Sequence, residues 1–373
     1  MKIWGKLKCN KGQIIVIALV LLLAVFGCVM VYSASFYSAQ HHYGNQYFFL
    51  FKQIFGVVLG IAGMTFFALF DYHRLAKLKW WIVGGTIILL ALVFIPGIGM
   101  ESYGAKRWVS ILGISIQPSE IAKFALVIFC ASYMSENTHK VKTLKGLIPV
   151  LAVAGVFAIL LMLEPSMSVT MCLAFVTLFM LIIGGITKKH TLMFSVPAGA
   201  LVPALIVLEP YRLKRLFAFI DPWASPQGEG FQLIQSLYSL GDGGLFGVGL
   251  FQSRQKYLFL PFAESDFVLS IIGEEIGFIG TTLLMCVYLY LTYRLIKIAL
   301  NAKDRFGSML ASGVAFVIAV QTLHNIAVVT GSIPPTGLPL PFISSGGTSV
   351  AVFMSAVGIA LNVDRQSRKN VIQ

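Results

Sequence analysis

The chain has few charged side chains: they make up 12% of its 373 residues, whereas 57% are hydrophobic. Soluble domains carry about 25% charged residues, so this composition excludes a soluble globular protein. Apolar stretches near the roughly 20 residues that a membrane-crossing helix needs recur at 14–34, 47–70, 80–98, 117–134, 146–163, 167–186, 191–208, 267–293, 307–330 and 346–363. We therefore predict an all-α polytopic membrane protein with about ten transmembrane helices, forming a single domain over residues 1–373.

Cysteine is also scarce, and its spacing carries no signal. The five cysteines are scattered one to a segment, with no CxxC pair, so neither a disulfide framework nor a cysteine metal site is predicted. His41 and His42 have no cysteine or carboxylate close in sequence, and we interpret them as solvated loop residues. The glycine-rich run at 241–249 lacks the spacing of a phosphate-binding loop. Its glycines are instead expected either to let one backbone approach another closely or to form a re-entrant turn.

Acidic residues are few: 15 Asp and Glu stand against 28 Lys and Arg, for a net charge of +13. An excess of this kind can indicate nucleic-acid binding, but its distribution favours another interpretation. With ten spans and the N-terminus inside, 19 of the 28 cations fall on the cytoplasmic side, in segments 1–13, 71–79, 135–145, 187–190, 294–306 and 364–373. This is the positive-inside pattern of membrane proteins. We predict cytoplasmic termini, an uncleaved first span and no nucleic-acid partner.

One large extracytoplasmic loop, residues 209–266, is predicted between the seventh and eighth helices. Near its start a basic cluster of Arg212, Lys214 and Arg215 fits either a phosphate site or an anchor to lipid headgroups. The loop ends at Asp266, where an apolar helix begins, and Glu274 lies on the same face of that helix. Two interpretations of Asp266 are open: a general base at the mouth of a partly dry cavity, or a cap of the helix N-terminus.

Two further outer connections carry polar groups. The first, residues 99–116, places Lys106 and Arg107 on the outer face, against the charge trend. In the helix that follows, Glu120 and Lys123 are three residues apart and share a face. An ionisable pair inside a span is costly and typical of a functional site, although it also fits a structural salt bridge. The last connection, 331–349, has four prolines and four glycines, and such irregular backbone is tolerated at membrane depth only where protein buries it or it lines a cavity.

These motifs together resemble the SEDS family (shape, elongation, division and sporulation), which includes FtsW, RodA and SpoVE. The resemblance covers nearly the whole chain, and the residues around Asp266 are more similar to FtsW and SpoVE than to RodA. The motifs that carry it are Gly104-Ala-Lys-Arg-Trp-Val, Gln117-Pro-Ser-Glu-Ile-Ala-Lys123, Asp221-Pro-Trp, the run 243–261, Ser265-Asp266-Phe267 with Gly273-Glu-Glu275, and Thr336-Gly-Leu-Pro-Leu-Pro-Phe-Ile-Ser-Ser-Gly-Gly347.

The resemblance implies a peptidoglycan glycosyltransferase of the bacterial cytoplasmic membrane. Such an enzyme polymerises lipid II into glycan strands at the outer face, from a donor chain on undecaprenyl pyrophosphate. Asp266 would be the catalytic aspartate that takes a proton from the 4-hydroxyl of the acceptor sugar. For substrate binding we name Lys106, Arg107, Glu120, Lys123, Arg212, Arg215, Lys256, Glu274, Ser344 and Ser345.

The implied chemistry requires no cofactor, because pyrophosphate is already an activated leaving group; a divalent cation, Mg or Mn, is compatible with it. The implied partners are a class B penicillin-binding protein and other divisome or elongasome membrane proteins. One departure from the family pattern stands out: Glu164-Pro-Ser-Met-Ser168 lacks the usual Asp and Gly, which puts in doubt any role for a second outer carboxylate at position 166. The alternatives are a lipid II translocase or a non-catalytic scaffold for the penicillin-binding protein. The sequence does not separate division, elongation and sporulation.

Overall fold

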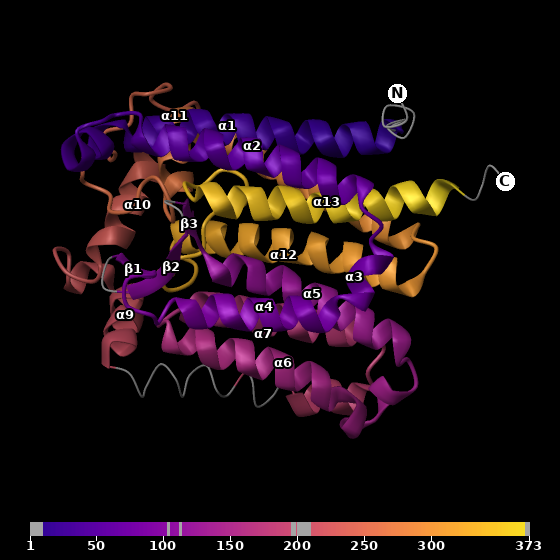
Figure 1. The fold of residues 1–373 in the computed structure, drawn as a ribbon. Helices are drawn as coiled ribbons and strands as arrows, with labels where there is room; N and C mark the ends of the chain where they lie inside the picture. Colours follow the sequence, from indigo (N-terminus) through magenta and orange to yellow (C-terminus); the bar gives the residue numbers. More distant parts are fainter. Residues whose placement is uncertain (1–9, 103–104, 112–113, 195–198, 200–209, 370–373) are drawn as a thin grey trace.

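The computed structural model describes residues 10–102, 105–111, 114–194, 199 and 210–369. Its long helices run side by side, with both ends of the chain at one end of the bundle (Figure 1). We call this the terminal end and the opposite one, which holds the strands and two short helices, the loop end. The helices are α1 Lys11–Tyr43, α2 Phe48–Leu69, α3 His73–Lys77, α4 Lys79–Leu92, α5 Pro118–Glu136, α6 Leu144–Leu163, α7 Met167–Ile183, α9 Pro210–Ile220, α10 Phe231–Gly243, α11 Val268–Leu300, α12 Arg305–Val329 and α13 Gly347–Lys369.

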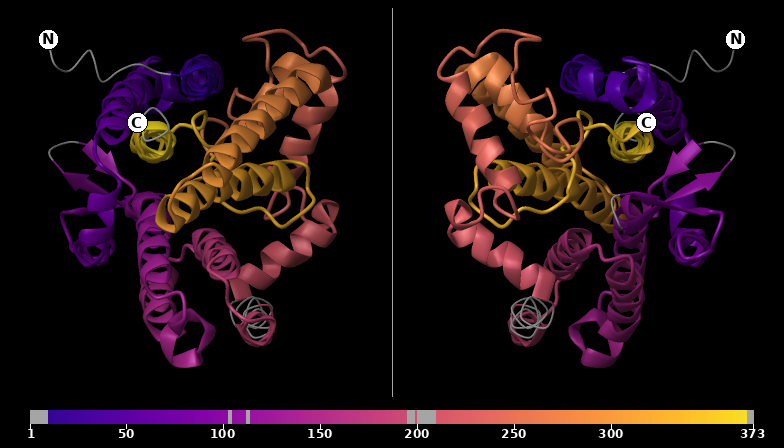
Figure 2. Two further views of the ribbon diagram at one scale, coloured as in Figure 1. Left: turned by 90° about the vertical axis from the view of Figure 1, so that its right-hand side faces the viewer. Right: turned by 90° about the vertical axis from the view of Figure 1, so that its left-hand side faces the viewer.

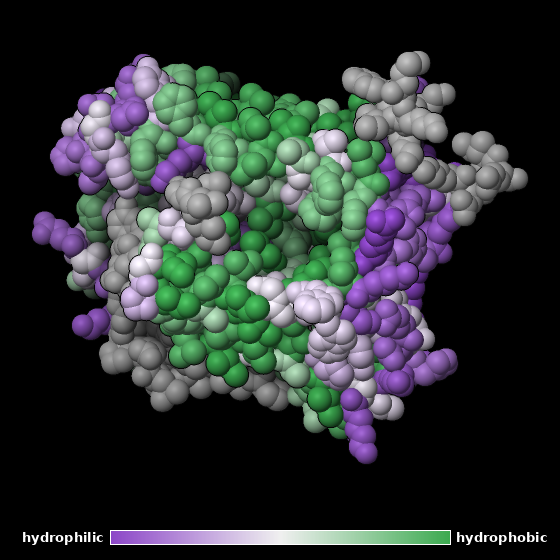
Figure 3. All heavy atoms as spheres, viewed as in Figure 1, coloured by the Kyte–Doolittle hydropathy of each residue, from purple (hydrophilic) through white to green (hydrophobic). Residues whose placement is uncertain are grey.

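The apolar surface matches a protein that crosses a membrane several times. Among the described residues, six helices are long and apolar enough to span a bilayer (α1, α2, α6, α11, α12 and α13), and α4 and α7 are shorter apolar helices. Hydrophobic atoms fill the middle of the face in Figure 3, whereas hydrophilic ones gather at its two ends. The prediction of a mostly helical, polytopic membrane protein is confirmed. The seventh predicted span, 191–208, lies largely outside the described residues.

The centre of the bundle is formed by α5, α12 and α13, around which the other helices are arranged (Figure 2). In their most apolar windows, α12 and α13 are 67% and 72% buried, against 28–39% for the other four candidate spans. Residues 122–132 of α5 are buried without interruption, so this helix packs against other parts of the protein on all its sides. These three helices therefore supply the fixed frame for polar groups inside the bundle.

Close packing of α2 against α13 depends on small residues. A Cβ atom at Gly56 would lie 2.0 Å from the backbone oxygen of Gly347, and one at Gly60 would lie 2.5 Å from the sulfur of Met354. Spacing of small residues by four lets two helix backbones approach each other where lipid gives no hydrophobic drive for helix association. The packing fixes the start of α13, and with it the end of the last outer connection.

The outer connection after α4 folds into a small sheet, so the prediction of an all-α fold is wrong in this segment. The antiparallel order is β1 Gly99–Ser102, β2 Ala105–Ile111, β3 Ile114–Ile116. In β2 the side chains alternate between faces, so Arg107 shares a face with Val109, which is fully buried. The sheet therefore directs Arg107 towards the interior of the loop end.

The glycine-rich run docks against a break in α11. Gly277 has φ 68° and ψ −172° within that helix, a conformation that favours glycine. Across the break, Val248 and Gly249 donate backbone hydrogen bonds to Glu274 and Glu275 at 2.9 and 3.0 Å. A Cβ atom at Gly277 would lie 2.3 Å from the backbone nitrogen of Gly247. The expected close approach of two backbones is confirmed.

Candidate active site around Asp266

Asp266 lies at the loop end, immediately before α11. The N-cap position of α11 is Phe267, not Asp266, and the helix has no side-chain cap hydrogen bond there. The interpretation of Asp266 as a helix cap is therefore wrong. Its carboxyl group is available for another role, and the residue is half-buried.

The last outer connection forms one wall of the site. The side-chain amide of Asn325, in α12, donates hydrogen bonds to the backbone oxygens of Asp266 and Leu338, both at 2.9 Å. A Cβ atom at Gly337 would lie only 2.7 Å from Oδ2 of Asp266. The connection therefore packs directly on the carboxylate, and glycine leaves the room for it.

Ser344 and Ser345 fasten the chain just before Asp266. The hydroxyl of Ser344 donates to the backbone oxygen of Ser265 at 2.6 Å, and the backbone N–H of Ser345 donates to the backbone oxygen of Glu264 at 2.8 Å. Both serines thus lie beside Asp266, as candidate site residues should. The contacts observed position the segment; binding of substrate by these serines stays a prediction.

Two arginines from other segments act on Asp266. Burial raises the pKa of Asp266 to about 6; Arg107 of β2 and Arg215 of α9 oppose this rise, and the nearby Glu264 adds to it. Arg215 also forms an ion pair with Glu229 at 3.6 Å. Burial therefore outweighs the two cations, and the carboxylate is a stronger base than an exposed aspartate while still ionised at neutral pH.

Glu164 is a further acidic residue at this end, and the sequence alone did not single it out for a role. It is 1% exposed, and neither carboxyl oxygen finds a hydrogen-bond partner among the described residues. Arg107 donates to the adjacent backbone oxygen of Pro165 at 2.8 Å. Burial raises the pKa of Glu164 to about 8, although Arg107 lowers it. Arg107 therefore interacts with two carboxyl groups, one ionised and one protonated at neutral pH.

Glu120 and Lys123 form a fully buried ion pair in α5. The ammonium of Lys123 lies 2.8 Å from both carboxylate oxygens of Glu120 and donates to Gln321 of α12. Gln321 donates in turn to the backbone oxygen of Pro339 at 2.8 Å. The pair thus connects α5 through α12 to the connection that walls the site. A structural role is visible, and a direct role in substrate binding stays a prediction.

Glu274 and Lys256 hold the large loop to the bundle. Glu274 accepts hydrogen bonds from the hydroxyls of Ser253 at 2.6 Å and Ser239 at 3.1 Å. Lys256 forms a fully buried ion pair with Glu275 at 2.9 Å. The polar face of α11 therefore packs on α10 and the loop. Contact of Glu274 or Lys256 with substrate stays a prediction.

Two predicted binding residues lie outside the part of the structure whose side chains are described: Lys106 and Arg212. No group of three or more His, Cys, Asp or Glu side chains that could hold a metal ion occurs among the described residues. A divalent cation brought by the pyrophosphate stays a prediction.

The fold and the site define a multi-pass membrane protein with a half-buried aspartate at its loop end, on which two arginines from other segments act. Within that class, the chain belongs to the FtsW/RodA/SpoVE family: the family model described as "Cell cycle protein" matches residues 13–369. The predicted family is confirmed. The chain is 38% identical over 362 residues to "Stage V sporulation protein E" of Bacillus subtilis (strain 168), covering 97% of this chain and 99% of the relative.

Other relatives and two solved structures agree. The chain is 39% identical to the "Probable peptidoglycan glycosyltransferase FtsW" of Geobacter sp. (strain M18), covering 95% of this chain and 97% of that one. A chain from the solved structure "Structural coordination of polymerization and crosslinking by a peptidoglycan synthase complex" has TM-score 0.79 and 27% identity, covering 97% and 99%. The crystal structure of RodA from Thermus thermophilus has TM-score 0.71 and 25% identity, with the same coverage. The family and the apolar helices place this protein in the cytoplasmic membrane.

Proposed function

We propose that this chain is a peptidoglycan glycosyltransferase that polymerises lipid II into glycan strands. The observation that carries the proposal is the half-buried Asp266, whose pKa burial raises to about 6 while Arg107 and Arg215 act on it from two other segments. A base and cations at one place match a transfer in which a hydroxyl loses a proton and a pyrophosphate leaves.

In the proposed reaction, Asp266 removes the proton from the 4-hydroxyl of the acceptor sugar. The oxygen then forms a bond to the anomeric carbon of the donor sugar, and the bond from that carbon to the pyrophosphate oxygen breaks. The electron pair departs with the pyrophosphate, and Arg107 and Arg215 stabilise its negative charge. The proton on Asp266 returns to solvent before the next transfer. No nucleotide is consumed, because the donor is already activated.

The proposed orientation has ten spans, with both termini in the cytoplasm and the loop end outside. It is supported by the excess of Lys and Arg in the segments at the terminal end. In this orientation Asp266 and the loop 209–266 face the space in which glycan strands are built.

A class B penicillin-binding protein is the proposed partner. The support is the structural likeness to a chain of a peptidoglycan synthase complex that coordinates polymerization with crosslinking. Other divisome or elongasome proteins are further candidates. The relatives named FtsW and stage V sporulation protein E favour division or sporulation over elongation as the setting.

The test compares Asp266→Asn with Asp242→Asn, an exposed acid in the same large loop. Purified protein with its penicillin-binding partner is given lipid II, and polymer is measured on a gel. Removal of a general base costs about 10²–10⁴-fold in rate, so Asp266→Asn should lose polymerisation and Asp242→Asn should retain it. Equal polymer from both variants would contradict the proposal.

The two alternatives predict different outcomes, each in an assay of its own. A translocase would move lipid II to the other leaflet of a liposome without forming polymer. A scaffold would support growth of cells that carry Asp266→Asn as well as the unmodified chain does.

A further inference from the structure

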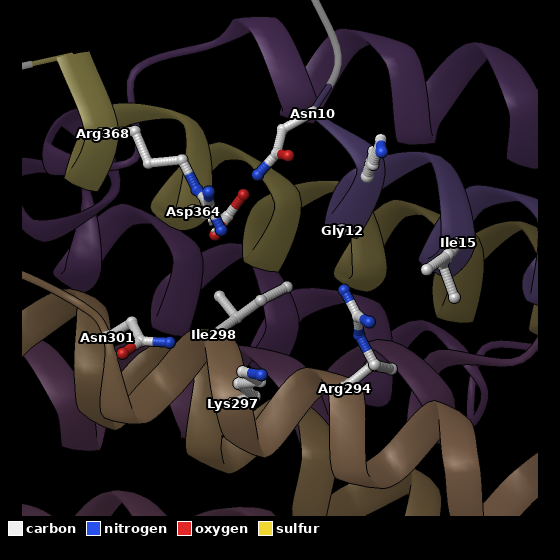
Figure 4. A pocket seen from close by; sticks show the side chains of 10 residues that line it. Asn10, Gly12, Ile15, Arg294, Lys297, Ile298, Asn301, Asp364 and Arg368 are labelled. Atoms are coloured by element: carbon white, nitrogen blue, oxygen red, sulfur yellow. Dashed lines mark hydrogen bonds and ion pairs between the residues drawn. The ribbon is translucent and has the colours of Figure 1, made fainter. Parts of the chain in front are cut away.

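A cavity of about 270 Å³ opens at the terminal end, far along α11 from Asp266. It lies between the first turn of α1, the last turns of α11 and the end of α13 (Figure 4). None of the residues discussed for the active site lines it. The chemistry of its lining therefore needs an explanation of its own.

Four cations from three helices line this cavity, against one acid. They are Lys11 of α1, Arg294 and Lys297 of α11, and Arg368 of α13; the acid is Asp364. Asp364 forms an ion pair with Arg368 at 3.1 Å. Even with that pair formed, three positive charges remain around the hollow.

The two arginines converge on one point. A Cβ atom at Gly12 would lie 2.7 Å from Nη2 of Arg294 and 3.9 Å from Nη2 of Arg368. The absence of a side chain at Gly12 thus leaves room for both guanidinium groups beside the first turn of α1. Backbone N–H groups and the helix dipole at that turn also favour negative charge.

The positive-inside pattern explains cations at this end, but not their convergence. Separate interface cations lower their mutual repulsion by extending away from one another into water. Here they surround a hollow, and their repulsion is relieved most directly by an anion inside it. A phosphate group fits, because guanidinium groups bind phosphate oxygens through paired, charge-assisted hydrogen bonds.

Apolar side chains at the same place indicate that the phosphate belongs to a lipid. Ile15 and Ile298 line the cavity together with the cations. Ile14 and Ile296, on the same two helices, are 53% and 44% exposed. A water-soluble anion gains nothing from these neighbours, whereas acyl chains can lie against them.

We propose that the cavity between α1, α11 and α13 binds the headgroup phosphate of an anionic phospholipid. The proposal needs only the membrane location and not the polymerase activity. In the proposed orientation the lipid belongs to the cytoplasmic leaflet, where anionic headgroups attract basic segments. A bound lipid would connect α1, α11 and α13 at the terminal end.

The test uses the full-length protein, purified in detergent and stripped of lipid. Native mass spectrometry measures binding of phosphatidylglycerol, phosphatidylcholine and inorganic phosphate. The variant Arg294→Gln/Arg368→Gln removes the two converging charges. Its matched control is Lys188→Gln/Lys189→Gln, which removes two exposed charges outside the cavity.

We expect the unmodified protein and the control to prefer phosphatidylglycerol, and the arginine variant to bind it about tenfold more weakly or worse. The single exposed change Lys297→Gln should weaken binding less, by about threefold, and guards against misfolding of the double variant. An equal loss in the control, or no preference over phosphatidylcholine, would overturn the proposal. Inorganic phosphate bound as tightly as the lipid would also overturn it, in favour of a site for soluble anions.

Discussion

The side-chain amide of Asn325 donates a hydrogen bond to the backbone oxygen of Asp266 at 2.9 Å. The same amide group donates to Leu338, so one side chain of α12 fixes the candidate base and the connection that packs on it. The site is therefore positioned from the buried centre of the bundle.

Asn325→Ala tests this positioning. Loss of the two hydrogen bonds should let Asp266 and the connection move apart and lower the polymerisation rate about tenfold or more, with a smaller effect on lipid II affinity. Thr330→Ala, an exposed change just after the same helix whose hydrogen bonds are local, is the control. An Asn325→Ala protein with an unchanged rate and an unchanged pH profile would show that Asp266 does not depend on this contact.

Gly337→Ala tests the contact between the last connection and the carboxylate. The added methyl group would lie 2.7 Å from Oδ2 of Asp266, whereas one at Gly346 has nothing nearer than 3.4 Å, at Ser349. We expect Gly337→Ala to lower the rate about 10-fold or more, because displacement of a reacting group by about 1 Å is costly, and Gly346→Ala to be tolerated. Equal rates for the two variants, measured with equal amounts of folded protein, would disprove the close contact.

The pH dependence follows from the pKa of Asp266, which is raised to about 6. A general base acts when deprotonated, so the polymerisation rate should be low at pH 5 and rise through pH 6 to a plateau near neutrality. The rate of polymer formation at fixed lipid II concentration over pH 5 to 8 measures this. A flat profile over that range would contradict the role of Asp266 as base.

Glu164 should govern the alkaline side of the same profile. Burial raises its pKa to about 8, so it holds a proton at pH 7 and ionises above pH 8, where it attracts Arg107 away from Asp266. Glu164→Gln mimics the protonated form: near pH 7 we expect a rate within about twofold of the unmodified chain, because one neutral hydrogen-bonding group replaces another. Above pH 8 we expect the rate of the unmodified chain to fall as Glu164 ionises, and the rate of Glu164→Gln, measured up to pH 9, to stay level. A large loss at pH 7 would instead mean that the ionised form is required.

A double variant of the buried pair Glu120 and Lys123 tests whether this pair stabilises the fold or takes part in the reaction. Lys123→Met alone leaves a carboxylate buried without its cation and should destabilise the protein by about 3–5 kcal/mol, whereas Glu120→Gln/Lys123→Met should recover much of that loss. Thermal unfolding in detergent measures both. A stable double variant that still polymerises lipid II would assign the pair to structure; a stable but inactive one would assign it to the site.

Sequence reasoning located most of the membrane helices, because spans depend on composition and length, which are local. It missed the small sheet, since Ala105–Ile111 is short and was interpreted only as a loop between spans. It also missed the environment of Glu164. Burial of that side chain comes from its tertiary neighbours, and nothing in Glu164-Pro-Ser-Met-Ser168 itself predicts that burial.

The convergence of Asp266, Arg107 and Gly337 was likewise beyond the sequence. Each residue belongs to a separate outer connection, and only the packing of α5, α12 and α13 brings these connections together. The motif pattern named Asp266 and Arg107 as candidates; their proximity is a property of the fold.

The most direct test of the account is the rate of lipid II polymerisation by the purified protein with its penicillin-binding partner, for Asp266→Asn beside Asp242→Asn. The account predicts a loss of about 100-fold or more for Asp266→Asn, with unchanged thermal stability and unchanged partner binding, and full activity for Asp242→Asn. Polymerisation by Asp266→Asn at the rate of the unmodified chain would contradict it.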